Sequence, residues 1–132
     1  MMVTFNGPVV YDAGALLAAE RGDDRLRALH RRFLLHGISP YVPAPVLAQT
    51  WRGGSRQVGM ARVLKGCALL PTDEDVAKRA GVLLGLSGTA DAVDAIVVAA
   101  AIKLTATVVT SDPKDLRLLS DAAAFHLGLV EV

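Results

Sequence analysis

The chain has 132 residues, a length that fits one domain with a hydrophobic core of useful size. Hydrophobic residues make up 52% of it and charged residues 20%, which excludes a disordered chain and a coiled coil. The net charge of +1 gives no indication of nucleic-acid binding by the molecule as a whole, and the single cysteine, Cys67, excludes an internal disulfide and a multi-cysteine zinc site.

The sequence gives no indication of export or of a membrane-spanning segment. The N-terminal Met-Met-Val-Thr-Phe-Asn lacks a basic start followed by an apolar stretch, so we expect no signal peptide. The longest clean apolar run, Ala95–Ile102, is far too short to span a bilayer. We therefore expect a cytoplasmic protein, and a lone cysteine suits that reducing compartment.

Basic residues are concentrated in one third of the chain. Between Glu20 and Lys65 there are nine basic and three acidic residues, a net charge of +6, so the rest of the chain carries −5. A basic segment beside an acidic remainder suits a metal-dependent enzyme that acts on phosphate substrates. Solvated arginines on helix surfaces explain the pattern equally well, because the sequence does not show whether they share a face.

The first half of the chain alternates β-rich and helical segments. Gly7-Pro8 precedes a strand at Val9–Tyr11, and a helix over Ala13–Glu20 follows it. Asp23 or Asp24 caps a second helix, which Gly37 stops. The next expected elements are a strand at Tyr41–Val42, a helix entered through Pro43 and Pro45 and running to Trp51, a break at Gly53-Gly54, and a helix over Arg56–Lys65.

The second half continues the alternation. We expect a strand at Ala68–Leu70, a helix from about Asp73 to Leu86, a turn at 87–89, a helix over Asp91–Leu104, a strand at Thr107–Val109, a short helix beginning at Pro113 and a closing strand at Leu129–Val130. Strands alternating with helices predict an α/β fold with a parallel sheet covered on both faces. No repeat or linker interrupts the pattern, so residues 1–132 are expected to form a single domain.

Three aspartates stand at places where a site could form. Asp12 and Asp112 each follow a predicted strand, and ligands of open parallel sheets bind beyond the carboxyl ends of the strands. Asp94 lies at the head of a helix that is apolar nearly all round, where an isolated carboxylate would be costly to bury. Ordinary turn aspartates remain the alternative for Asp12 and Asp112, as does a helix cap for Asp91, three residues before Asp94.

Clustered carboxylates point to a hard divalent cation. Oxygen ligands without histidine or cysteine suit Mg²⁺ or Mn²⁺, and close carboxylates repel one another unless a cation binds between them. Such ions activate water and neutralise a phosphodiester in the transition state. Asp115, in the first turn after Pro113, is a weaker candidate because it also complements the helix dipole.

Three segments together resemble one family. VVYDAGALLA around Asp12, DAVDAIVVAAA around Asp94 and VVTSDPKDL around Asp112 are similar in order and spacing to the motifs of PIN-domain nucleases, especially VapC-type toxins. The resemblance runs from about Val9 to Val130. It implies a three-layer α/β/α domain with a central parallel sheet, Mg²⁺- or Mn²⁺-dependent cleavage of RNA, and a homodimer that pairs with an antitoxin.

The resemblance also assigns roles by position. It implies that Asp12, Asp94 and Asp112 hold the metal and that Asp91 and Asp115 fall where additional acids are sometimes found. Thr110 matches a hydroxyl residue near the site, and we group Ser111 with it as a residue that supports the site or contacts substrate. One position departs from the family pattern: Gln49 in VPAPVLAQTWRGG stands where a glutamate is usual, so the expected site has one negative charge fewer.

Two other hypotheses compete with a nuclease. Gln49 could mark a catalytically weakened PIN-like module that only binds partners, and metal-dependent RNA cleavage would separate the two. A phospho-acceptor receiver domain requires an adjacent acidic pair after its first strand and a lysine after a late strand. It is disfavoured because Asp12 stands alone and Asp112 occupies the late position.

Several other residues are not expected to act in catalysis. Trp51 is interpreted as a core or interface residue, and His30, His36 and His126 as surface or helix-end residues. The helices around Leu34, Val46 and Val63 are candidate contact surfaces for the dimer.

Overall fold

A computed structural model describes residues 7–132 of the chain. Five parallel strands form one sheet in the order β3-β2-β1-β4-β5, with bounds β1 Val9–Tyr11, β2 Tyr41–Pro43, β3 Ala68–Leu70, β4 Thr107–Thr110 and β5 Leu129–Glu131. The α-helices of the described range are α1 Ala13–Glu20, α2 Asp24–Leu35, α3 Ala44–Thr50, α4 Val58–Lys65, α5 Glu74–Ser87, α6 Ala92–Leu104 and α7 Pro113–Ala122, with a short 3-10 helix η1 at Ser55–Gln57.

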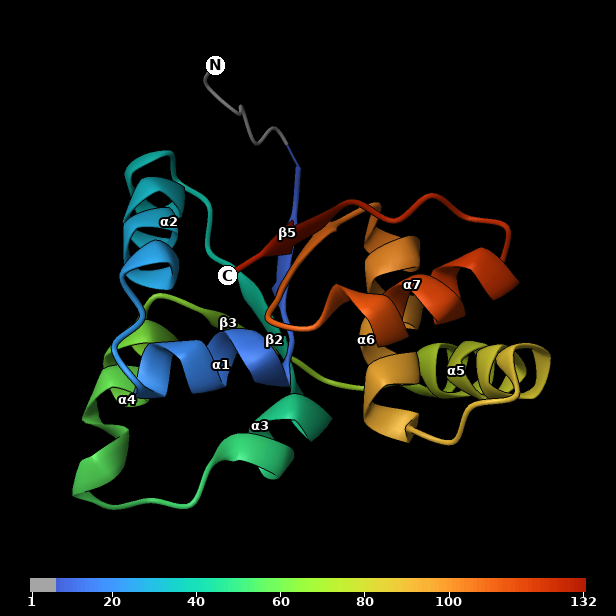
Figure 1. The fold of residues 1–132 in the computed structure, drawn as a ribbon, viewed down its shortest axis with the longest axis horizontal. Helices are drawn as coiled ribbons and strands as arrows, with labels where there is room; N and C mark the ends of the chain where they lie inside the picture. The colour runs from blue at the N-terminus through green and yellow to red at the C-terminus, as the bar shows by residue number, and fades with distance from the viewer. Residues whose placement is uncertain (1–6) are drawn as a thin grey trace.

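The helices cover both faces of the sheet. Figure 1 shows α1, α2 and α4 on one side and α5, α6 and α7 on the other, with α3 near the end where β1 and β2 finish. The contacts agree, because α1 packs against α2 and α4 while α5, α6 and α7 pack against one another. The α/β expectation of a parallel sheet inside two helical layers is therefore confirmed.

Strand β1 lies in the middle of the sheet, which explains its unbroken apolar sequence. Val9, Val10 and Tyr11 are at most 1% exposed, as expected for a strand covered on both faces. Tyr11 of β1 is level with Val109 of β4, so the two strands end side by side. The residues that follow them, Asp12 and the segment after Thr110, therefore begin at the same edge.

Helix α6 supplies much of the core beneath this edge. Its buried residues are small, alanine and valine, which lets the helix lie close to the sheet. Figure 1 shows α6 beginning near the end where β1 finishes, so its first turn, with Asp94, faces the same region. The core thus brings the ends of β1 and β4 and the first turn of α6 to the same edge of the sheet.

The segment between α3 and α4 differs from the expectation. Helix α3 ends at Thr50, and the helix expected from Arg56 begins at Val58 after the 3-10 turn. Gly53 and Gly54 have φ values of 77° and 94°, which L side chains rarely adopt, so glycine suits the expected break between the two helices. Trp51 is 42% exposed, which excludes the core as its place.

One further expectation, about His30, was wrong. His30 is 8% exposed and its Nδ1 lies 2.8 Å from the Tyr11 hydroxyl, so it is a hydrogen-bonded core histidine and not a surface one. Val46 is fully buried and Val63 is 7% exposed, so these two side chains add little to the surfaces of α3 and α4. Leu34 on α2 is 44% exposed, and contact surfaces on these helices remain a prediction.

Two expectations concern targeting. The absence of a signal peptide was inferred from residues 1–6, which lie outside the described range. Among the described helices, none is by itself long and apolar enough to cross a membrane. Helices α5 and α6 meet the length and composition criteria only as a pair, and they are bent by 115° relative to each other.

Candidate functional site

Asp12 follows β1 directly and begins α1. Its carboxylate accepts a hydrogen bond of 2.9 Å from the Ala15 backbone N–H, so it caps the helix, and it is only 6% exposed. Burial raises the pKa of Asp12; hydrogen bonds from the Thr110 side chain and from the backbone at Ala15 and Gly14 oppose that rise, and the charge of Asp112 adds to it. Asp12 therefore both caps α1 and lies at the carboxyl edge of the sheet.

The end of β4 places Thr110 and Asp112 beside Asp12. Thr110 is fully buried, and its hydroxyl oxygen accepts a 3.0 Å hydrogen bond from the Asp112 backbone N–H. Asp112 begins α7 but its side chain makes no capping hydrogen bond, unlike those of Asp12 and Asp91. Thr110 thus holds the turn that carries Asp112, while the exposed carboxylate of Asp112 is not used to cap its helix.

Asp94 shows that the aspartates share one electrostatic environment. The carboxylate of Asp91 caps α6 by accepting a 3.0 Å hydrogen bond from the Asp94 backbone N–H. Partial burial and then the negative charges of Asp91, Asp12, Asp115 and Asp112, in that order, raise the pKa of Asp94 to about 6. The other four predicted acids therefore lie close enough to act on the Asp94 carboxyl group.

These carboxylates are near one another but do not form a tight cage. Among residues 7–132, no three aspartate, glutamate, histidine or cysteine side chains are arranged so that they could hold a metal ion as they stand. The donor types nevertheless fit Mg²⁺ or Mn²⁺, because the group offers carboxylate oxygens and a threonine hydroxyl. Burial raises the pKa of Asp94 most, and the neighbouring negative charges that add to this rise are what a divalent cation would neutralise.

Gly14 of α1 packs closely against Ser111, which follows β4. A Cβ atom at Gly14 would collide with the Ser111 hydroxyl oxygen and lie 2.8 Å from the Ser111 backbone nitrogen. The first turn of α1 therefore packs directly on the loop between β4 and α7. This places Ser111 in a packing role beside the site, and the need for a glycine after Asp12 could not be inferred from the sequence alone.

We expect Gly14→Ala to destabilise the fold by about 1–3 kcal/mol, because the added methyl group must push the Ser111 loop away. Urea unfolding would measure the change. Gly81→Ala is the matched control: Gly81 lies in α5 with open space around it, so the same substitution should stabilise the protein by about 0.5–1 kcal/mol. Equal effects of the two substitutions would contradict the close approach.

The segment VPAPVLAQTWRGG, which carries Gln49, is held in place by another glutamine. Gln49 lies on α3, which contacts α1 and α6, and its side chain is exposed. The buried glutamine is Gln57, which is 4% exposed. Its amide nitrogen donates to the Thr50 carbonyl oxygen at 2.8 Å, and its amide oxygen accepts from the backbone nitrogens of Arg52 and Gly53 at 2.8 and 2.9 Å.

Gln57 therefore fixes the loop that leads away from α3. An apolar residue at this place would leave three backbone groups without these partners. The polar run around it gives no sign of such burial, so sequence reasoning missed it.

The model of the PIN-domain family matches residues 9–121. The chain belongs to the PIN-domain family. No curated protein matches the chain significantly. Among solved structures, the chain is similar to VapBC2 from Rickettsia felis bound to a DNA fragment of its promoter, with a TM-score of 0.72, 16% identity, and coverage of 94% of this chain and 98% of that one.

Two further solved structures are similar to the chain to about the same degree. FitAcB from Neisseria gonorrhoeae has a TM-score of 0.67 and 17% identity, covering 93% of this chain and 96% of that one. A toxin–antitoxin complex from Klebsiella pneumoniae has a TM-score of 0.68 and 17% identity, covering 94% and 99%. At these identities the likeness shows the fold alone.

Proposed function

We propose that this PIN-domain chain is a Mg²⁺- or Mn²⁺-dependent ribonuclease and the toxin half of a toxin–antitoxin pair. The gathering of five aspartates at the carboxyl edge of the sheet carries the proposal: burial and then the charges of the other four raise the pKa of Asp94. Clustered negative charges at the head of a helix destabilise the fold, so a structural role alone does not explain them. Membership of a nuclease family adds to that argument.

Asp12, Asp94 and Asp112 would hold the cation. When bound, the cation supplies Lewis acidity toward water and charge neutralisation at the scissile phosphate. Thr110 orients the site through its hydrogen bonds to the Asp12 carboxylate and the Asp112 backbone. Asp91 and Asp115 add negative charge from the α6 and α7 heads, and the tight contact of Gly14 with Ser111 keeps the two strand ends in register.

We further propose a homodimer, an antitoxin as its partner and a cytoplasmic location. The similar structures from Klebsiella pneumoniae and Rickettsia felis are described as a toxin–antitoxin complex and as VapBC2 on promoter DNA, which supports an antitoxin partner. Leu34 is an exposed apolar residue available for contacts between chains.

The alternative is a PIN-domain module that binds partners without cleaving RNA, and Gln49 is the observation that favours it. Its amide is neutral where the family resemblance implies a glutamate, so the site has one charge fewer. Purified protein that cleaves a labelled RNA only with Mg²⁺ or Mn²⁺, and no longer does so after chelation with EDTA, would decide for the nuclease. Metal binding without cleavage would decide for the binding module.

We expect Gln49→Glu to tighten Mn²⁺ binding by up to about tenfold, because an added carboxylate attracts the cation by a few kcal/mol at an effective dielectric near 20, less the desolvation cost. Isothermal titration calorimetry on parent and variant would measure it. Ala28→Glu adds the same charge at an exposed position on α2 and should leave the affinity unchanged. An unchanged affinity in Gln49→Glu would mean that α3 does not reach the metal and that the aspartates hold it alone.

A further inference from the structure

The exposed loop after α3 carries the one tryptophan of the chain. Trp51 is 42% exposed, and every tyrosine and phenylalanine side chain in residues 7–132 is less exposed. The run Trp51–Arg56 is exposed throughout and contains two arginines, two glycines and no acidic residue. A large aromatic ring held outside the core, beside positive charge, indicates a surface that contacts a ligand or a partner.

Hydrogen bonds fix the backbone on both sides of Trp51. Buried Gln57 donates to the carbonyl oxygen of Thr50, the residue before the tryptophan. It also accepts from the backbone nitrogens of Arg52 and Gly53, the residues after it. The Trp51 backbone N–H closes the last turn of α3 with a hydrogen bond of 2.8 Å. The ring is therefore presented from a preorganised backbone, which lowers the entropy lost when a ligand binds.

The guanidinium group of Arg52 is held beside the tryptophan. Its Nη1 atom donates to the Trp51 carbonyl oxygen at 2.8 Å and to the Ala48 carbonyl oxygen at 3.3 Å, at the C-terminal end of α3. No acidic side chain in residues 7–132 pairs with Arg52. The other N–H groups of the guanidinium therefore remain to donate to an anion beside the indole ring, and phosphate oxygens suit them.

Helix α3 connects this loop to the aspartate site (Figure 1). It begins directly after β2, whose Tyr41 pairs with Val10 of β1. Pro43 and Asp12 each lie two residues beyond that pair, so α3 starts at the same edge of the sheet as Asp12. The helix packs on α1 and α6, whose heads carry Asp12 and Asp94, and its seven residues span about 10 Å. A few nucleotides of RNA cover that distance.

The charge of the aspartate site explains why a separate binding surface is needed. Five carboxylates repel a phosphodiester chain until a cation neutralises them, so affinity for RNA must come largely from elsewhere. The loop supplies positive charge and a flat ring at a short distance. A Cβ atom at Gly53 or Gly54 would meet nothing within 4 Å, so a strand can approach the backbone closely.

We propose that Trp51 and Arg52 form a subsite for an unpaired nucleotide of the RNA that the aspartate site would cut, with the base on the indole ring and a phosphate on the guanidinium group. The substrate class rests on the proposed function. Stacking on a side chain needs a base freed from a duplex, and it tolerates any sequence because every base has a π face. A protein contact fits less well, because Trp51 is the one apolar side chain in the run Trp51–Arg56.

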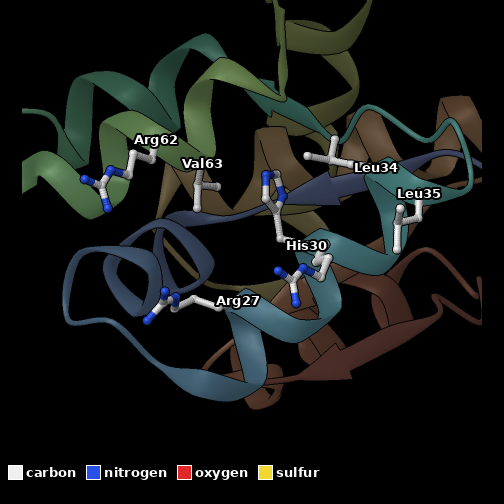
Figure 2. Close-up of a pocket in the computed structure, with 7 residues that line it drawn as sticks. Arg27, His30, Leu34, Leu35, Arg62 and Val63 are labelled. Carbon is white, nitrogen blue, oxygen red and sulfur yellow. The ribbon is translucent and has the colours of Figure 1, made fainter.

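Another basic surface provides the matched control. Figure 2 shows Arg27 of α2 at an open pocket that Arg62 and Val63 of α4 also line. No tryptophan, tyrosine or phenylalanine lines this pocket, and Arg27 is exposed. Arg27 attracts a polyanion through its charge alone, so Arg27→Gln measures general electrostatic attraction.

The test uses a single-stranded RNA of about twelve nucleotides without internal pairing. Because the chain has one tryptophan, its emission reports on Trp51 alone. Binding to the full chain is measured in EDTA, where a metal-dependent nuclease does not cut, by quenching of this emission and by anisotropy of a labelled copy of the RNA. The comparison probes are the same strand annealed to its complement and an abasic ribose-phosphate strand of equal length.

We expect the single strand to bind and to quench Trp51, and the duplex and the abasic strand to quench little. Trp51→Leu should weaken binding of the single strand by at least about fivefold, whereas Trp51→Phe keeps a ring and should weaken it by less than about threefold. Arg52→Gln should lower the slope of log affinity against log salt by about 0.7. Arg27→Gln should change the affinity by less than about twofold.

Three results would overturn the proposal. The first is emission that the single strand leaves unchanged, or that the abasic strand quenches equally. The second is an equal loss of affinity in Arg52→Gln and Arg27→Gln, which would mean general charge attraction. The third is a dimer that Trp51→Leu converts to monomers in sedimentation while the RNA affinity stays the same, which would make the loop a contact between copies of the chain.

Adding Mn²⁺ separates this subsite from the proposed nuclease. If both are present, Trp51→Leu should still cleave RNA, with KM raised by at least about fivefold. Cleavage with an unchanged KM in Trp51→Leu would leave the nuclease in place and remove the subsite. Binding and quenching by the single strand without cleavage would keep the subsite and remove the nuclease.

Discussion

Asp94→Asn is expected to abolish metal-dependent RNA cleavage while making the metal-free protein more stable. The loss follows from the proposed function, in which Asp94 is a charged metal ligand. Changes to residues behind a metal ligand cost about 10–100-fold in activity or affinity, so loss of the ligand itself should cost at least a hundredfold. Cleavage of a labelled RNA at saturating Mn²⁺, with calorimetry to follow metal affinity, would measure both effects.

The gain in stability comes from removing a charge that the metal-free fold disfavours. Because burial and four neighbouring aspartates raise the pKa of Asp94 to about 6, its ionised form is disfavoured in the folded protein at neutral pH. Asparagine has nearly the same shape without the charge, so the free energy of unfolding at pH 7 should rise by about 1–3 kcal/mol. Asp121→Asn, an exposed aspartate on α7, is the control and should change neither quantity.

A variant that loses cleavage and also loses stability would show that Asp94 supports the fold and that its charge serves no ligand. A variant that keeps cleavage would remove Asp94 from the site. The two readouts therefore separate a functional carboxylate from a structural one, which activity alone cannot do.

Strand and helix alternation predicted the fold because burial on both faces leaves a clear pattern. Val9–Tyr11 is a short apolar run followed directly by Asp12, and Thr107–Thr110 is a β-branched run followed, after Ser111, by Asp112. The sheet pairs the two strands in parallel at its centre. Each aspartate's place at the carboxyl edge then follows from topology alone. The same argument could not say how the carboxylates are oriented, because that depends on side-chain contacts such as Thr110 with Asp112.

Features that depend on tertiary contacts could not be predicted from the sequence. Gln57 is as polar as Gln49, yet only Gln57 is buried, because the turn at Gly53 and Gly54 folds backbone groups over it. His30 lies on an arginine-rich helix and its burial depends on Tyr11 of a distant strand. Propensity and periodicity do not report such pairings, since they act within one segment.

The metal-free protein should also reveal Asp94 through the pH dependence of its stability. An acid whose pKa is raised in the folded state binds a proton more tightly when folded. Its contribution therefore stabilises the fold as pH falls through about 6 toward the ordinary value of 3.8, and the cost of its charge is fully present above pH 6. Asp12, whose pKa is also raised, acts in the same direction.

Other groups oppose this trend, so the measurement must be a difference. Burial lowers the pKa of His30, and hydrogen bonds lower those of Asp73 and Asp75, so each of these groups removes stability as pH falls through its own range. These groups are unchanged in Asp94→Asn. Subtracting the two unfolding curves between pH 4 and pH 7 therefore isolates the titration of Asp94 together with its coupling to the neighbouring aspartates.

We expect the stability advantage of Asp94→Asn over the parent to be largest at pH 7 and to fade toward pH 4, changing by about 1–3 kcal/mol across the range. Saturating Mg²⁺ should reverse the order at pH 7, because in the proposed site the cation would bind the Asp94 carboxylate and stabilise only the folded parent. Lowering the pH through 6 should then remove the benefit of Mg²⁺ as protons compete for Asp94. A difference that stays constant with pH, with or without Mg²⁺, would show that this carboxyl group titrates normally and binds no cation.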